Sequence, residues 1–124
     1  MSGLTYDTGA LIAAEANDRL LWSLHSAALT HGIVPTVPAG VLGEVWRGGP
    51  QHNLSRALKG CRIEPLVESR ARAIGVLAAS SGLDDTVDLA VTEGALRRGD
   101  AVVTSNRSDI ELAAGGQRIV IHDV

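Results

Sequence analysis

The chain has 124 residues, of which 45% are hydrophobic and 20% are charged, the size and composition of one folded domain. A single cysteine excludes a disulfide scaffold, and an aromatic content of 2% argues against a protein that binds single strands by stacking bases on exposed rings. The formal net charge of −3 argues against a broad basic surface, so any nucleic acid has to be bound at a local site.

The stretch between residues 20 and 43 has no Asp, Glu, Lys or Arg and is long enough to cross a bilayer. Two histidines and two prolines interrupt it, so it is not the continuous apolar run of a membrane helix. Residues 1–7 lack the basic start and apolar core of a signal peptide. The lone thiol of Cys61 fits a reducing compartment. We therefore expect a cytoplasmic protein without a membrane segment.

Strand and helix signals alternate from the start of the chain. A first strand is predicted over residues 4–7, followed by helices over residues 10–15 and 18–31. The longer helix has apolar residues at the spacing of one buried face, namely Leu20, Leu21, Leu24, Ala27 and Ala28. A second strand is predicted over residues 33–36, and Pro38 suits the first turn of a helix that ends near Trp46.

The same alternation continues to the end of the chain. The remaining predicted elements are a short helix over 54–58, an extended segment over 61–66, helices over 68–80 and 85–98, a strand over 101–104, a helix over 108–114 and a strand over 118–122. The strands are apolar runs, which is typical of a parallel sheet buried on both faces. We predict an α/β fold, a three-layer α/β/α sandwich with a central, mainly parallel sheet, in one domain over residues 1–124.

Four acidic residues lie where such a sheet carries its sites, beyond the carboxyl ends of the strands. Asp7 ends the first strand, and Asp109 comes after the fourth strand together with Asn106. Glu44 lies on the helix after the second strand, and Asp88 lies near the start of the helix before the fourth strand. Carboxylates from four distant segments are therefore predicted to converge at one end of the sheet.

Such convergence is unfavourable without a counter-charge. At about 5 Å and an effective dielectric constant of about 20, each pair of like charges costs about 3 kcal/mol. A small domain has a total stability of only roughly 5–15 kcal/mol. The cluster therefore requires a cation or a protonated acid. An oxygen-only set of ligands favours Mg²⁺ or Mn²⁺, which acidifies water and neutralises charge that develops on a phosphate. The acids thus indicate metal-dependent hydrolysis of a phosphodiester.

Each acid also has an ordinary structural interpretation that the sequence leaves open. Asp7 can cap the helix that comes after it, and Glu44 can face solvent in an otherwise apolar helix. Asp84 and Asp85 suit helix caps better than ligands. Asp88 is harder to explain in this way, because its apolar neighbours indicate a buried setting.

Taken together, these residues resemble the PIN domain, and more narrowly the VapC toxins of bacterial toxin–antitoxin pairs. The resemblance runs in order over nearly the whole chain and rests on four motifs of low individual information. The matching segments are residues 4–12, 37–47, 86–90 and 102–110. Trp46 and Arg47, directly after the second acid, are similar to mycobacterial VapC proteins in particular. Asn106 departs from the pattern, because the family often has Asp there, and this predicts weaker metal binding.

The resemblance implies an endoribonuclease toxin that cleaves tRNA or ribosomal RNA and inhibits translation. Its catalytic residues, which would also hold Mg²⁺ or Mn²⁺, would be Asp7, Glu44, Asp88 and Asp109. The supporting residues would be Thr104, Ser105, Asn106 and Asp85. We expect Arg47 to contact a substrate phosphate, although a solvated helix end is an open alternative, and we expect a structural role for Arg97 and Arg98 at the end of their helix.

The resemblance also implies protein partners, a VapB-type antitoxin and a second copy of the chain in a homodimer. The helices over residues 18–31 and 41–46 are candidate walls of the antitoxin groove. Trp22 and Trp46 are its candidate anchors, with core packing as the alternative.

Three other functions stay open at this point. A degenerate PIN-like domain could act only as a protein- or RNA-binding module, an alternative that Asn106 supports. A PIN nuclease outside toxin–antitoxin biology is also compatible with the motifs. A response-regulator receiver has acids at strand ends too, but it needs a lysine after a late strand, and the sole lysine, Lys59, lies in the wrong region.

Overall fold

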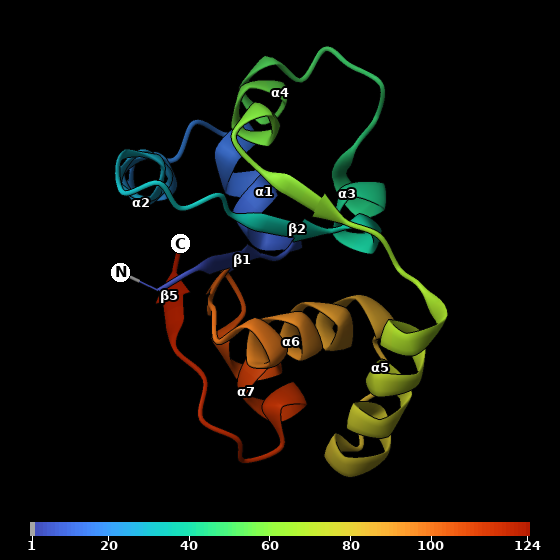
Figure 1. Cartoon of the computed structure of the whole chain (residues 1–124). Coiled ribbons are helices and arrows are strands. Elements are labelled where there is room, and N and C mark those ends of the chain that lie inside the picture. Colours follow the sequence, from blue (N-terminus) through green and yellow to red (C-terminus); the bar gives the residue numbers. More distant parts are fainter. Residues whose placement is uncertain (1) are drawn as a thin grey trace.

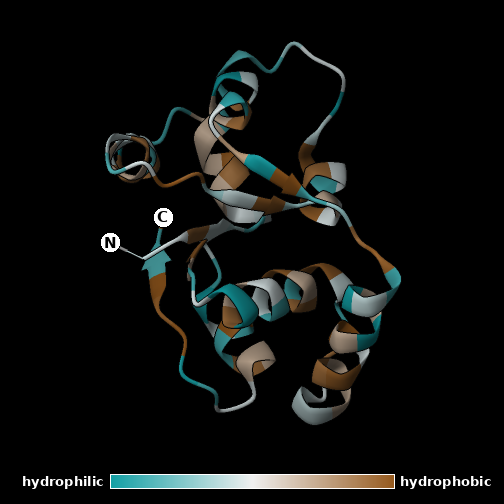
Figure 2. Cartoon of the chain, viewed as in Figure 1, coloured by the Kyte–Doolittle hydropathy of each residue, from teal (hydrophilic) through white to brown (hydrophobic). Residues whose placement is uncertain are grey.

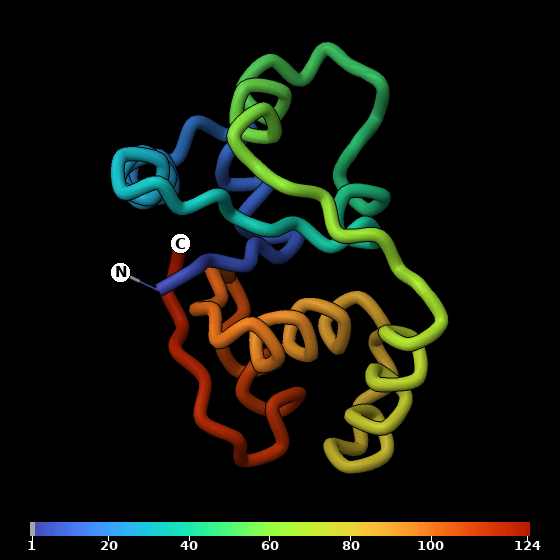
Figure 3. Tube along the Cα trace, viewed as in Figure 1, coloured from blue at the N-terminus to red at the C-terminus, as the bar shows by residue number. Residues whose placement is uncertain are grey.

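The computed structural model describes residues 2–124. Its strands are β1 (Leu4–Tyr6), β2 (Thr36–Pro38), β3 (Arg62–Glu64), β4 (Ala101–Thr104) and β5 (Ile121–Asp123). Its helices are α1 (Thr8–Glu15), α2 (Arg19–Thr30), α3 (Ala39–Val45), α4 (His52–Lys59), α5 (Glu68–Ser81), α6 (Thr86–Arg98) and α7 (Arg107–Ala114). Figure 1 shows the elements, and Figure 3 traces the same path along the Cα atoms.

The five strands form one parallel sheet in the order β3-β2-β1-β4-β5. Helices α1, α2 and α4 lie on one side of the sheet, and α5, α6 and α7 lie on the other (Figure 1). The predicted three-layer α/β/α sandwich is therefore confirmed. Because every strand runs in the same direction, all five carboxyl ends meet at one edge, which we call the carboxyl edge.

The centre of the sheet forms the core, as the apolar strand runs predict. Every residue of β1, β2 and β4 is buried, and Ala10, Leu11 and Ala14 of α1 are fully buried against them. The outer strand β3 is more exposed and mixes hydrophilic with hydrophobic positions (Figure 2). In residues 2–124, no helix has both the length and the apolar character that a membrane span requires.

Two strands lie further along the chain than the sequence predicts. The second strand is predicted over residues 33–36 but is Thr36–Pro38, because the Ile33 amide donates to the Ala28 carbonyl and so belongs to the turn that closes α2. Pro38 is the last residue of β2 and the N-cap of α3, a position that its fixed φ of −60° allows. The last strand is predicted over residues 118–122 and is Ile121–Asp123.

The end of α6 is held to the sheet by a network of ion pairs. Arg98 donates to Glu64 at 2.7 Å, to Asp100 at 2.9 Å and to the buried Thr5 hydroxyl at 2.8 Å. Arg97 pairs with Glu64 at 2.6 Å. Both arginines thus have structural partners, in line with the role expected for them.

Candidate active site

Asp7 lies at the carboxyl edge, directly after the central strand β1, and is only 5% exposed. It is the N-cap of α1, since its Oδ1 accepts a hydrogen bond from the Ala10 amide at 2.9 Å. Burial raises the pKa of this carboxyl, while hydrogen bonds from Thr104 and from the Ala10 and Gly9 amides lower it in part. The cap hydrogen bond uses Oδ1, and a carboxylate that caps a helix can still bind a ligand, so the two interpretations of Asp7 are compatible.

Asp88 is half-buried in the first turn of α6 and is surrounded by other acids. Its pKa rises to about 6, first because of burial and then because of the negative charges of Asp85, Asp109, Asp7 and Glu44. Four other carboxylates therefore act on one side chain. The charges of the four predicted acids are thus felt at one position of the carboxyl edge, and whether they share one metal ion stays a prediction.

Glu44 extends from α3, the helix after the neighbouring strand β2. Its side chain is exposed, and its Oε1 accepts a hydrogen bond from the Thr8 hydroxyl at 3.3 Å. Its charge also contributes to the raised pKa of Asp7. Glu44 is therefore exposed to solvent and also next to the other acids. Its two interpretations, a solvent-facing position and a site residue, are compatible.

The turn between β4 and α7 places the fourth acid. Asp109 lies in the first turn of α7 and accepts a hydrogen bond from Asn106 Nδ2 at 2.6 Å. The Asn106 backbone amide in turn donates to the Thr104 hydroxyl at 2.8 Å. The side-chain amide at position 106 therefore orients Asp109 through a hydrogen bond, which a carboxylate at that position could do only by holding a proton.

Gly9 and Ser105 connect the first and fourth motifs, a pairing that no sequence pattern indicates. A Cβ at Gly9 would lie 2.0 Å from Ser105 Oγ and 3.0 Å from the Ser105 backbone nitrogen. Only glycine allows this approach, which brings the turn after β1 against the turn after β4. The adjacent small residues Thr8 and Gly9 are the available signal in the sequence.

Two predicted site residues have other partners in the structure. Asp85 is the N-cap of α6 and accepts hydrogen bonds from the amides of Val87 and Asp88 through one oxygen, Oδ1. The Arg47 guanidinium folds back on the end of α3, where it donates to the carbonyls of Glu44 at 2.7 Å and Trp46 at 2.8 Å. Asp85 is thus a helix cap beside the site, and Arg47 lies next to Glu44 but caps its helix.

The donors at this edge suit a hard divalent cation, because they are all oxygen atoms and repel one another. Among residues 2–124, however, no group of three or more His, Cys, Asp or Glu side chains has an arrangement that could hold a metal ion. The acids are neighbours rather than a closed cage, since Asp7 and Asp85 cap helices and Asp109 is bonded to Asn106. The chemistry of the donors fits a metal, and closing around one would need side-chain movement.

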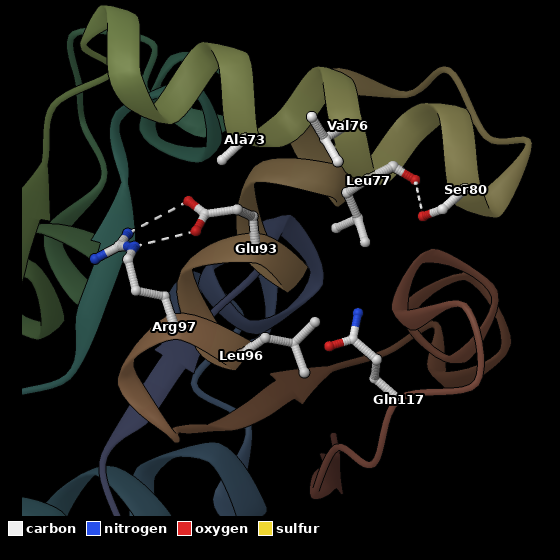
Figure 4. A pocket seen from close by; sticks show the side chains of 8 residues that line it. All are labelled: Ala73, Val76, Leu77, Ser80, Glu93, Leu96, Arg97 and Gln117. Atoms are coloured by element: carbon white, nitrogen blue, oxygen red, sulfur yellow. Dashed lines mark hydrogen bonds and ion pairs between the residues drawn. The ribbon is translucent and has the colours of Figure 1, made fainter.

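A pocket between α5 and α6 offers an alternative location for a site (Figure 4). Its lining includes Arg97 and Glu93, which are paired with each other at 3.1 Å. None of the predicted site residues, all within the described part of the chain, lines this pocket. The acids at the carboxyl edge therefore remain the candidate site.

No family model matches the sequence, and no curated protein matches it either. Solved structures do match. A chain of the VapBC2 complex of Rickettsia felis, bound to a DNA fragment from its promoter, superposes with a TM-score of 0.75 at 13% identity over 98% of each chain. A chain of DNA-bound VapBC from Salmonella typhimurium superposes with a TM-score of 0.72 at 18% identity, over 99% of this chain and 98% of that one.

A chain of a toxin–antitoxin complex from Klebsiella pneumoniae gives a TM-score of 0.71 at 22% identity, over 99% of this chain and 100% of that one. These are matches of nearly complete chains rather than of a shared fragment. The protein has a PIN-like fold. The fold expected from the sequence motifs is thereby confirmed at low sequence identity.

We predict that Asp88→Asn stabilises the metal-free PIN-like domain at neutral pH. Asp88 has a raised pKa in the folded state, so the folded chain holds more protons than the unfolded chain between about pH 4 and pH 6, and its stability falls as pH rises through this window. Urea unfolding in EDTA at pH 7 should show Asp88→Asn about 1 kcal/mol more stable than wild type, a value reduced for partial exposure. The difference should shrink toward pH 4.

The exposed Asp84, four residues earlier, provides the control, since Asp84→Asn makes the same chemical change outside the site. A stabilisation of Asp88→Asn that is equal at pH 4 and pH 7 would show that charge repulsion at Asp88 is not its cause.

Proposed function

We propose that this protein is a metal-dependent endoribonuclease and a toxin of the VapC type. The observation that carries the proposal is that Asp7, Glu44, Asp88 and Asp109 lie on turns and helix ends at the carboxyl edge of a PIN-like fold, where the other three charges help to raise the pKa of Asp88. Solved chains of the same fold belong to toxin–antitoxin complexes, which supports the assignment to a toxin. The substrate would be tRNA or ribosomal RNA, and the site of action would be the cytoplasm.

Asp7, Glu44, Asp88 and Asp109 are the residues that would hold Mg²⁺ or Mn²⁺. A bound divalent cation would neutralise the charge that develops on a phosphate and would lower the pKa of water. Asn106 hydrogen-bonds to the Asp109 carboxyl and orients this one proposed ligand, while the other side chains would have to move to close around the cation.

The net charge of the chain is compatible with an RNA substrate under this proposal. The whole chain carries −3, and the four proposed ligands account for four negative charges, so the remaining residues are formally +1. The acidity is concentrated at the site, where a cation would offset it. We propose that Arg47, next to Glu44, contacts a phosphate of the RNA after leaving the carbonyls of α3.

We propose a groove beside Glu44 as the surface for a VapB-type antitoxin. Residues of α1, α3 and α4 line it together with Arg47, and Ile12 and Trp46 are exposed near it. Within residues 2–124, its lining does not include α2, which the sequence suggests as a wall. Trp22 is packed instead, since its Nε1 donates to the Ala14 carbonyl and Arg56 lies 4.1 Å from its ring centre.

We also propose a homodimer, which the resemblance implies. Ile63 of β3 and Leu66 and Val67 after it are exposed apolar side chains in one short segment. An exposed sheet edge with adjoining apolar side chains is a surface that association would cover.

The direct test is cleavage of purified tRNA and ribosomal RNA with Mg²⁺ or Mn²⁺. Asp7→Asn keeps the shape of the side chain and its cap to Ala10, so we expect the variant to fold. Its cleavage rate should be lower than that of wild type by a factor of about 100 or more. Asp84→Asn should cut at the wild-type rate, and EDTA should stop wild-type cleavage. Equal cleavage by wild type and Asp7→Asn would favour the alternative function, a binding module without catalysis.

The toxin assignment has a separate test in growing cells. Induction of wild type in a bacterial host should arrest growth, induction of Asp7→Asn should not, and co-expression of a small antitoxin gene adjacent to this one should restore growth. Equal growth of both cultures, combined with cleavage in vitro, would indicate a PIN nuclease outside toxin–antitoxin biology.

A further inference from the structure

Arg107 lies at the carboxyl edge on the side of the site opposite to Arg47. It is the first residue of α7 and comes directly after Asn106, while Arg47 comes after α3. In the sheet, β2 lies on one side of β1, and β4 and β5 lie on the other. The loop that carries Arg47 and the turn that carries Arg107 therefore flank Asp7, which lies directly after β1.

The Arg107 guanidinium is bound by a carboxylate of the next strand. Its Nε donates to both carboxylate oxygens of Asp123 at 3.1 and 3.2 Å, and its Nη2 donates to Asp123 Oδ2 at 2.8 Å. Weaker contacts reach Glu111 at 3.3 Å and the Ile121 carbonyl at 3.2 Å. Arg107 thus presents its planar Nε–Nη2 side to an anion, the same geometry in which arginine binds phosphate oxygens.

This ion pair is open to exchange because both partners are solvated. The side chains of Arg107 and Asp123 are 46% and 61% exposed, and the side chain of Glu111 is 55% exposed. Exposed ion pairs of this kind add little to stability and are screened by salt. In contrast, the side chain of Arg98, which also binds several acids, is 14% exposed and holds the buried Thr5. The partners of Arg107 can be replaced without unfolding the core.

A polyanionic substrate would compete with Asp123 for the Arg107 guanidinium. RNA that reaches Asp7, Asp88 and Asp109 also brings phosphates on either side of the scissile bond, and the acids repel them. We infer that Arg107 binds an RNA backbone phosphate beside the acid site, and that Asp123 holds its guanidinium in place until this phosphate displaces it. The inference rests on the proposed function and adds a second phosphate contact across the site from Arg47.

The test is binding of a short fluorescein-labelled single-stranded RNA, measured by anisotropy in EDTA so that no cleavage occurs. Arg107→Ala should weaken binding about 5–10-fold at low salt and reduce the slope of log K against log salt by about 0.7. Asp123→Asn should tighten binding about 2–5-fold, because it frees Arg107. Arg72→Ala, which removes an exposed arginine from α5, is the matched control and should bind as wild type does.

The double variant Arg107→Ala/Asp123→Asn separates release of Arg107 from a general loss of negative charge. If Asp123 acts through Arg107, adding Asp123→Asn to Arg107→Ala produces no tightening. Tightening of the same size in both backgrounds would overturn the inference, as would unchanged binding by Arg107→Ala. If the Arg107–Asp123 ion pair only stabilises the fold, Asp123→Asn should instead weaken RNA binding and lower the melting temperature.

Two outcomes distinguish this inference from the proposed function. Wild type that binds no RNA in EDTA and cleaves none with Mg²⁺ or Mn²⁺ overturns the proposed function, and the inference with it. Binding that Arg47→Ala weakens and Arg107→Ala leaves intact overturns only the inference. If Arg107→Ala fails to fold, Asp123→Asn still tests the inference, because it retains Arg107 and is expected to raise the affinity for RNA.

Discussion

The hydrogen bond from the Ala10 amide to Asp7 Oδ1 is the interaction on which the rest of the site depends. It fixes the turn between the central strand and the first helix, and it holds a buried carboxylate at the carboxyl edge. Gly9, in the first turn of α1, lets Ser105 approach from the end of β4. A helix cap and a glycine contact thereby bring the first and fourth motifs together.

The same edge concentrates negative charge, and the fold tolerates this in specific ways. Asp85 and Asp109 accept hydrogen bonds from neighbouring amides, while burial and the surrounding negative charges raise the pKa of Asp88 to about 6. The acids stay on separate elements, so the chain folds without a closed cluster. Function and stability therefore oppose each other at Asp88, as at many sites that have to bind a charged ligand.

The fold and the set of acids were predictable because both depend on local pattern. Apolar runs that alternate with helical spacing specify a parallel sheet, and a parallel sheet gathers the turns after its strands at one edge. Asp7, Glu44 and Asp109 follow strands of this sheet, and Asp88 lies at the start of the helix that leads into β4, so a common edge for all four could be predicted without knowledge of side-chain conformation.

Features that depend on tertiary contacts could not be predicted in this way. The contact of Gly9 with Ser105 joins groups from distant segments whose geometry is set by packing. The shift of β2 to Thr36–Pro38 arises because the turn that closes α2 extends past its glycine to Ile33. The pairing of Arg107 with β5 likewise joins residues far apart in the sequence.

The central claim of the proposed function is that the acids at the carboxyl edge bind a divalent cation. Titration of the ¹⁵N-labelled protein with Mn²⁺ tests it most directly, because a paramagnetic ion broadens the amide signals nearest to it. The claim predicts that Gly9, Asp88 and Ser105 lose intensity first and that Asp7→Asn greatly reduces this loss. Broadening centred on Glu64 and Glu93, or no selective broadening at millimolar Mn²⁺, would contradict it.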